Sequence, residues 1–141
     1  MRALDIAKYI VAKCTIENEP IGNLQLQKIL YYIQVAFLQC KDKECFSDNI
    51  EAWKFGPVVR SVYIEYCTYA AMPIIEFNEP SLPFNNSDMA LINSIIENKR
   101  KSKPWKLVSD THKPGKAWDK VYQNGKGDKC IIDKELLKQY G

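Results

Sequence analysis

The sequence predicts a mainly α-helical fold, a compact single-domain bundle around a central buried helix over residues 24–40. Three observations support this fold class. The 141 residues are enough for one hydrophobic core, so we expect a single domain over residues 1–141. An apolar share of 46% and a charged share of 26% are typical of folded globular chains. Most apolar residues recur at spacings of three and four, which is the period of an amphipathic helix.

The first two predicted helices have the clearest periodicity. Residues 3–14 repeat apolar side chains on one face and are followed by a polar turn. Asn23 is expected to cap the central helix, because its side-chain oxygen can accept a hydrogen bond from a free N–H of the first turn. The central helix carries two apolar stripes, which predicts burial on most of its sides. The stripes are Leu26, Ile29, Leu30, Ile33 and Phe37, and Leu24, Tyr31, Val35 and Leu38.

The middle of the chain is predicted to combine a short strand with a helix. Weak alternation of apolar and polar residues favours a strand at residues 50–53. The short apolar run 130–132 is its expected partner, which gives a two-stranded β element. Gly56-Pro57 is expected to begin a helix that continues to about residue 67, because proline at the first helical position lacks only an N–H that would be unpaired anyway.

The second half is predicted to hold short helices joined by irregular segments. Three prolines make residues 72–86 an irregular connection. Ser87-Asp88 is expected to cap a helix that ends near residue 99. Shorter helices are expected at about 102–111, 118–122 and 134–140, the last capped by Asp133.

The net charge of +3 conceals an uneven distribution along the chain. Residues 98–129 contain ten Lys or Arg and three Asp, which is +7, and the remaining residues carry −4. This asymmetry suggests a charge-directed contact surface for an acidic protein or for nucleic acid, although solvated helix faces would give the same pattern. Lys103, Trp105 and Lys106 interleave positive charge with an indole, which could contact phosphates and stack on a base. A small nucleic-acid-binding regulator that uses residues 98–129 is therefore the alternative functional hypothesis.

The residue inventory argues against several other functions. His112 is the only imidazole, so a hydrolase or transferase, the third hypothesis, would depend on that one residue. The five cysteines are scattered and odd in number, so we expect buried reduced thiols and neither a disulfide framework nor a zinc site. No glycine-rich phosphate loop is present. We expect a binding protein with no catalytic residue, no cofactor and no metal.

No membrane association is expected. The N-terminal apolar run contains Asp5 and Lys8 and has no small-residue cleavage site, so we do not predict a signal peptide. The longest apolar stretch, residues 29–38, is too short to cross a bilayer. A cytoplasmic location follows as the expectation.

Three motifs, in one order over residues 5–140, resemble a known family. Residues 23–34, NLQLQKILYYIQ, are similar to an N-L-x-L-Q-K-L-L-Y-Y-x-Q helix. Residues 50–59, IEAWKFGPVV, are similar to an E-A-W-x-x-G-P-V-V signature, and residues 107–112 with Trp118 are similar to an L-x-x-x-T-H segment with a downstream tryptophan. Together they resemble the Panacea domain of the SocA-like antitoxins, which prophages often carry.

This resemblance implies a mainly helical antitoxin that neutralises a cognate toxin by direct protein–protein binding. The toxin is usually encoded by an adjacent gene, and one branch of the family acts as an adaptor that hands its toxin to a Clp-type protease. Trp53 is expected to pack in the core or to anchor a partner, and His112 to orient a turn or to contact a partner. The candidate partner-binding residues are Trp53, Phe55, Arg60, Lys103, Trp105, Lys106, His112, Lys116 and Trp118.

Overall fold

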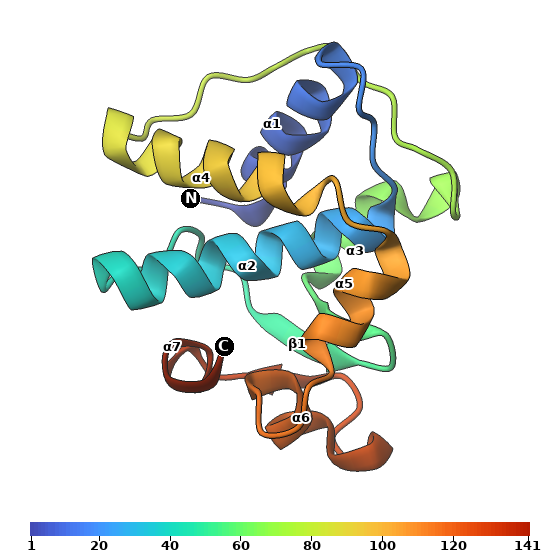
Figure 1. The fold of residues 1–141 in the computed structure, drawn as a ribbon, viewed down its shortest axis with the longest axis vertical. Helices are drawn as coiled ribbons and strands as arrows, with labels where there is room; N and C mark the ends of the chain where they lie inside the picture. The colour runs from blue at the N-terminus through green and yellow to red at the C-terminus, as the bar shows by residue number, and fades with distance from the viewer.

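The computed structural model describes all residues from 1 to 141, and its central element is helix α2, Asn23–Lys41. Helices α1, Ala3–Ile16, and α4, Asn86–Lys99, lie on one side of α2, and α7, Lys134–Tyr140, lies on the other (Figure 1). Both predicted apolar stripes of α2 are largely buried. The predicted mainly α-helical fold around a buried central helix is therefore confirmed.

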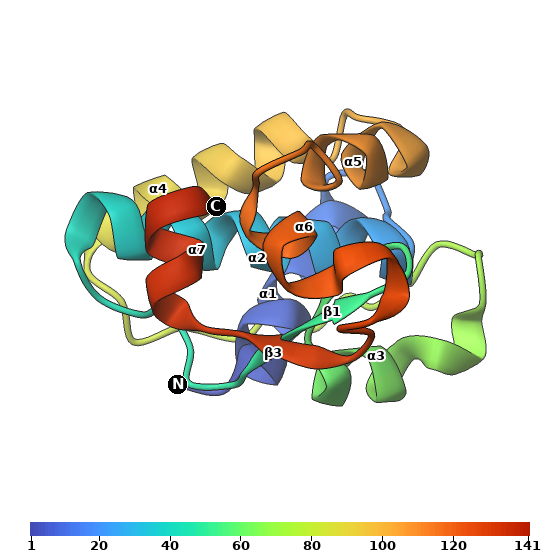
Figure 2. The same ribbon diagram turned by 90° about the horizontal axis from the view of Figure 1, so that it is seen from below.

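A small antiparallel sheet packs against the N-terminal half of α2. Its strands are β1, Ile50–Trp53, β2, Gly56–Val58, and β3, Cys130–Ile132, in the order β2-β1-β3. Strands β1 and β3 lie side by side, with Ala52 opposite Cys130, so the predicted pairing of these segments is confirmed (Figure 2). The prediction of only two strands is wrong, because β2 adds a third strand through the pair of Ala52 and Pro57.

The expected helix start at Gly56-Pro57 is wrong. Gly56 has a φ of 113°, which no right-handed helix can contain, and it turns the chain from β1 back into β2. Helix α3, Arg60–Tyr66, begins only after the extended residue Val59 and continues into the 3₁₀ turn η1, Cys67–Tyr69. The helical periodicity of this segment was correct, but its first turn belongs to the sheet.

Two predicted helix caps lie one to three residues away from the observed ones. Gly22 is the N-cap of α2, and Asn23 is its first helical residue. The Asn23 amide instead donates to the Tyr63 carbonyl and accepts from the Gln27 side chain, because it is buried between α2 and α3. Helix α4 is capped by Asn85, whose side chain accepts from the Asp88 N–H, and not by Ser87-Asp88.

The remaining elements follow the predicted order. Residues 70–85 form an extended connection without helix or strand, as the prolines predicted. Helix α5, Pro104–Thr111, has its proline in the first turn, and α6, Ala117–Tyr122, is followed by the 3₁₀ turn η2, Gln123–Gly125. Asp133 precedes α7 at the N-cap position without a side-chain capping bond. No helix is long and apolar enough to cross a membrane.

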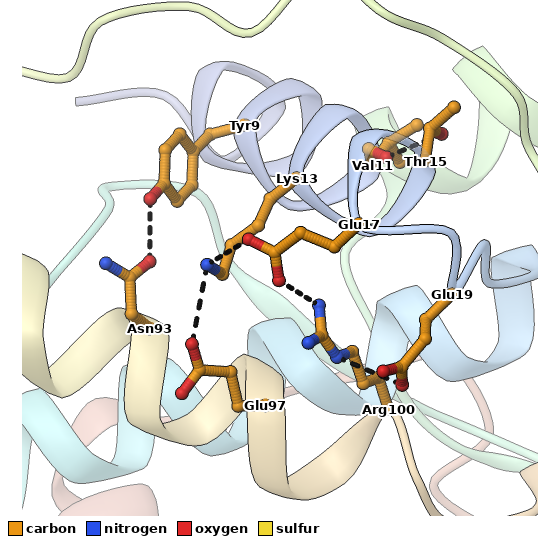
Figure 3. A network of polar contacts seen from close by, with 9 residues as sticks. All are labelled: Tyr9, Val11, Lys13, Thr15, Glu17, Glu19, Asn93, Glu97 and Arg100. Carbon is orange, nitrogen blue, oxygen red and sulfur yellow. Dashed lines mark hydrogen bonds and ion pairs between the residues drawn. The ribbon is translucent and has the colours of Figure 1, made fainter.

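Polar side chains join the C-terminal ends of α1 and α4 (Figure 3). Lys13 lies 2.8 Å from Glu17 and 3.5 Å from Glu97, measured from Nζ to the nearest carboxylate oxygen. Arg100 reaches Glu17 at 2.8 Å and Glu19 at 3.3 Å. We call these five residues the α1–α4 ion-pair network. Both cations are mostly buried, and each has two carboxylates as partners.

The cysteines only partly match the expectation of core thiols. Cys14 and Cys45 are buried, and burial raises the pKa of both thiols. Cys40, Cys67 and Cys130 are exposed, so the expectation is wrong for these three. Cys67 is exposed because it lies in the short turn after α3, beyond the buried face of that helix.

Candidate partner-binding site

The largest hollow that combines apolar walls with charged residues lies between the first turns of α2, the β1–β2 turn, α3 and the loop before β3. Its volume is about 460 Å³, which is the size of a pocket that holds a small ligand or one large side chain. We call it the aromatic pocket and define it by the lining residues that carry its chemistry: Lys28, Trp53, Lys54, Phe55, Tyr63 and Lys129.

Aromatic side chains form the wall and the rim of the aromatic pocket. Trp53 and Tyr63 meet edge to face with ring centroids 4.9 Å apart. At the rim, Phe55 meets Trp105 of α5 edge to face at 5.3 Å. Phe55 is 47% exposed and Trp105 is 62% exposed, although both are large aromatic residues. Aromatic residues beside a pocket are the residue type most enriched at the energetic centres of protein interfaces.

Trp53 is held from behind by two neighbours on the sheet side. Its indole N–H donates to Glu51, which also forms an ion pair with Arg60 at 2.7 Å. The Arg60 guanidinium holds the pKa of the Glu51 carboxyl below its usual range and lies 5.4 Å from the Trp53 ring. Arg60 therefore orients Trp53 and remains half exposed.

Lys28 lies in the floor of the aromatic pocket and is fully buried. Its ammonium donates to the Pro57 carbonyl at 3.2 Å and forms no ion pair with a carboxylate. Burial lowers the pKa of Lys28 to about 7. A Cβ on Gly56 would lie 2.7 Å from Lys28 Cε and 2.9 Å from Thr111 Oγ1, so the turn needs glycine for space as well as for its positive φ.

His112 and Trp118 lie behind the aromatic pocket and support it. Their rings stack 3.7 Å apart and almost parallel, and Trp118 stacks in turn on Tyr122. The Trp118 indole N–H donates to the Trp53 carbonyl at 2.7 Å, which fixes the end of β1. Burial and the nearby charge of Lys28 lower the pKa of His112. The stack connects α6 to the sheet, so these two residues position Trp53 from beneath.

The predicted lysines lie elsewhere. Lys106 and Lys116 line a separate hollow of about 300 Å³, together with Tyr31 and Tyr32 of α2. Lys106 pairs with Asp110 at 2.6 Å, and Lys103 is the exposed residue that precedes α5. The structure therefore brings Trp53, Phe55 and Trp105 together, but it does not bring these lysines to the aromatic pocket.

The basic segment 98–129 does not form one positive surface. Arg100 forms ion pairs with Glu17 and Glu19 in the α1–α4 ion-pair network. Lys99 lies 4.0 Å from the Tyr32 ring centroid, Lys120 lies 4.2 Å from that of Tyr140, and Lys129 faces Trp53 in the aromatic pocket. Four of the ten basic residues, Lys99, Lys106, Lys113 and Lys116, line the separate hollow beside Tyr31 and Tyr32, and the other six lie outside it.

Sequence reasoning missed four residues of the aromatic pocket, namely Lys28, Lys54, Tyr63 and Lys129. A signal was available for Lys28, because it is a charged residue in the middle of a helix that is apolar on most sides. No such signal existed for Lys129, which reaches the pocket only because β3 pairs with β1. No group of three or more His, Cys, Asp or Glu is arranged to hold a metal ion.

Two comparisons with known proteins agree with the motifs. A family model described as "Antitoxin SocA-like, Panacea domain" matches residues 26–119. Antitoxin SocA of Caulobacter vibrioides (strain NA1000 / CB15N) is 30% identical over 135 residues, which cover 86% of this chain and 70% of that protein. No solved structure matches the chain. The matched model contains the second and third motifs and residues 26–34 of the first, and the chain belongs to the SocA-like antitoxin family with a Panacea domain.

Proposed function

We propose that this protein is the antitoxin of a toxin–antitoxin pair and neutralises its toxin by direct binding through the aromatic pocket and its rim. The observation that carries the proposal is the exposed pair of Phe55 and Trp105 beside a pocket of about 460 Å³. Burying two such rings against a partner removes apolar area from water, at about 25 cal/mol per Å². The family membership supplies the antitoxin role.

The proposed activity is binding without catalysis. The one imidazole, His112, is stacked on Trp118, and its Nε2 is buried without a hydrogen-bond partner. A general base must reach a substrate proton, and the buried Nε2 of His112 does not meet this requirement, although the residue is partly exposed. The exposed pair of Phe55 and Trp105 favours a protein partner. The second candidate, nucleic acid, would instead use the separate hollow that Lys99, Lys106, Lys113 and Lys116 line with Asp110.

Co-expression with each flanking reading frame in a bacterial host tests this proposal. We expect one neighbour to arrest growth alone and to be neutralised by the wild-type protein. Phe55→Ala and Trp105→Ala should each weaken neutralisation, because each removes one ring of the rim. Phe77→Ala is the matched control, since Phe77 is 68% exposed and lies outside the pocket.

Two outcomes would contradict the proposal. If no flanking gene encodes a protein that is toxic alone and neutralised by this protein, the proposal that this protein is the antitoxin of an adjacent toxin gene fails. If Phe77→Ala abolishes rescue and the rim variants do not, the binding surface lies on the connection before α4, where Met72, Ile75 and Phe77 are exposed. The level of tagged toxin during rescue separates occlusion from delivery to a Clp-type protease, because only delivery lowers the amount of toxin.

A further inference from the structure

The aromatic pocket contains a positive charge that nothing in the chain neutralises. Lys28 is 0% exposed, and its ammonium donates a hydrogen bond to the neutral Pro57 carbonyl at 3.2 Å. An ammonium has three N–H donors, and a buried charge without a counter-ion is strongly disfavoured. Burial accordingly lowers the pKa of Lys28 to about 7, so the protonated and neutral forms of Lys28 are close in free energy near this pH.

The surroundings of Lys28 combine apolar walls with further positive charge. Trp53 and Tyr63 form the wall, and Lys54 and Lys129 lie at the exposed mouth, where their ammonium groups face the rings of Phe55 and Trp53. Asp128 is the only acidic residue of the lining. Three lysines against one aspartate give the pocket a net positive charge, which complements an acidic ligand.

We propose that the aromatic pocket binds an apolar or aromatic side chain of the partner polypeptide that stands beside a carboxylate, and that Lys28 is the buried counter-ion of this carboxylate. The apolar side chain packs against the wall that Trp53 and Tyr63 form by their edge-to-face contact, and the carboxylate lies on the side of the pocket that Lys28 lines. The volume of about 460 Å³ suits one large side chain with part of its neighbour. This inference rests on the proposed function in one respect, because the partner is the toxin.

The chemistry of the proposed site can be tested without the toxin. The probes are 3-phenylpropionate and its uncharged isostere 3-phenylpropionamide, titrated into the full-length protein at pH 7 and followed by NMR of the backbone and indole N–H groups. We expect shifts at the Trp53 indole and a carboxylate affinity at least about fivefold above that of the amide, because only the carboxylate gains the interaction with Lys28.

Three protein variants isolate the charge. Lys28→Met keeps the length of the side chain and should reduce the carboxylate preference to less than about twofold, while both probes still bind. Lys28→Gln serves as a second neutral replacement if the methionine disturbs the turn at Pro57. Lys134→Met is the matched control, because it removes a lysine that pairs with Glu44 outside the pocket and should leave the preference unchanged.

Equal affinity for the two probes, no detectable binding of either probe, or an unchanged preference in Lys28→Met would each overturn the proposal. Co-expression then separates this failure from failure of the proposed function. A wild-type protein that rescues no neighbour contradicts the antitoxin role and leaves the probe result valid. Rescue by the wild type and equally by the folded Lys28→Met variant contradicts the counter-ion and leaves the antitoxin role intact.

Discussion

The α1–α4 ion-pair network and the aromatic pocket differ in whether their buried cations have carboxylate partners. In the network, the side chains of Lys13 and Arg100 are 10% and 8% exposed, and each lies against two carboxylates (Figure 3). In the pocket, Lys28 is more deeply buried and has one neutral carbonyl. The network therefore joins two helices through compensated charges, whereas Lys28 in the pocket has no carboxylate partner within the chain.

The pKa values reflect the same contrast. Burial alone would lower the pKa of Lys13, but the hydrogen bond and charge of Glu17 outweigh burial and raise it. For Arg100 the carboxylates likewise outweigh burial. At Lys28 burial acts unopposed. The network thus stabilises the protonated forms of Lys13 and Arg100, whereas burial in the pocket destabilises the protonated form of Lys28.

The largest expected effect on stability comes from the close packing around Lys28. Gly56→Ala should lower the free energy of unfolding by about 3 kcal/mol, because it adds strain at positive φ to a contact with Lys28 and Thr111. Gly115→Ala is the matched control: its φ is also positive, but no atom lies within 4 Å of the added Cβ. Urea unfolding should give a loss of only about 1 kcal/mol there. Equal losses would show that the Lys28 contact carries no cost.

Neutral replacements of the two kinds of buried cation should change the free energy of unfolding differently. Arg100→Met should destabilise the protein by about 2 kcal/mol, because Glu17 and Glu19 lose a shared partner. Lys28→Met should leave the free energy of unfolding unchanged or raise it by about 2 kcal/mol, because it removes an unpaired buried charge. Chemical unfolding at pH 7 measures both. Destabilisation by Lys28→Met as large as that by Arg100→Met would mean that the Pro57 carbonyl is a sufficient partner.

The contrast also predicts a pH dependence. In the folded state the pKa of Lys28 is about 7, below its ordinary 10.5, so between these values the unfolded chain binds the extra proton. Stability should therefore rise with pH, by up to about 1.4 kcal/mol per unit, between pH 7 and 9. The raised pKa values of Lys13 and Arg100 leave their contribution flat in this window. The charged or titratable groups around Lys28 are His112, Lys54, Tyr63, Cys67, Asp128 and Lys129.

Unfolding curves of wild type and Lys28→Met, compared from pH 7 to 9, isolate this contribution. Burial raises the pKa of Cys14 and Cys45, so both thiols begin to ionise in the unfolded chain before they do so in the folded protein. Both proteins contain these cysteines, so their contribution cancels in the difference between the two curves. A difference between the two proteins that does not change with pH would contradict the assignment to Lys28.

The smallest expected effect concerns an exposed ion pair at the edge of the aromatic pocket. Arg60 is half exposed in its pair with Glu51, and Glu51 keeps the Trp53 indole N–H as a partner when Arg60 is removed. Arg60→Ala should therefore leave the urea midpoint unchanged within error. Its expected effect is a change in the Trp53 fluorescence signal, because the guanidinium no longer lies beside that ring. A large drop in the midpoint would place Arg60 in the same class as Arg100.

Local patterns predicted most of the fold. The spacing of the two apolar stripes predicts the helix α2. The prolines of residues 72–86 predict a segment without helix or strand. Both signals lie within a few residues of the structure that they predict. The error at Gly56-Pro57 arose because proline suits both a helix start and an edge strand, and only the positive φ of Gly56 decides between them. The error at Asn23 arose because a tertiary contact with Tyr63 uses the amide that would otherwise cap the helix.

The candidate site was predicted in part. Trp53, Phe55 and Trp105 were named from residue type, and they meet in the structure at the pocket and its rim. The lysines of residues 98–129 were grouped by their order in the chain, but helix packing distributes them over several faces. Lys28 was not named, because burial without a counter-ion is a property of the whole fold.

The protonation of Lys28 tests the central claim most directly. An NMR pH titration of the lysine Cε–Hε signals in protein labelled with ¹³C-lysine follows Lys28 and Lys13 in one sample, and Lys28→Met assigns the signal. The account predicts that Lys28 titrates near pH 7, whereas Lys13 remains protonated beyond its ordinary pKa of 10.5. Titration of Lys28 together with Lys13 above pH 10 would contradict the claim that the aromatic pocket holds an uncompensated charge.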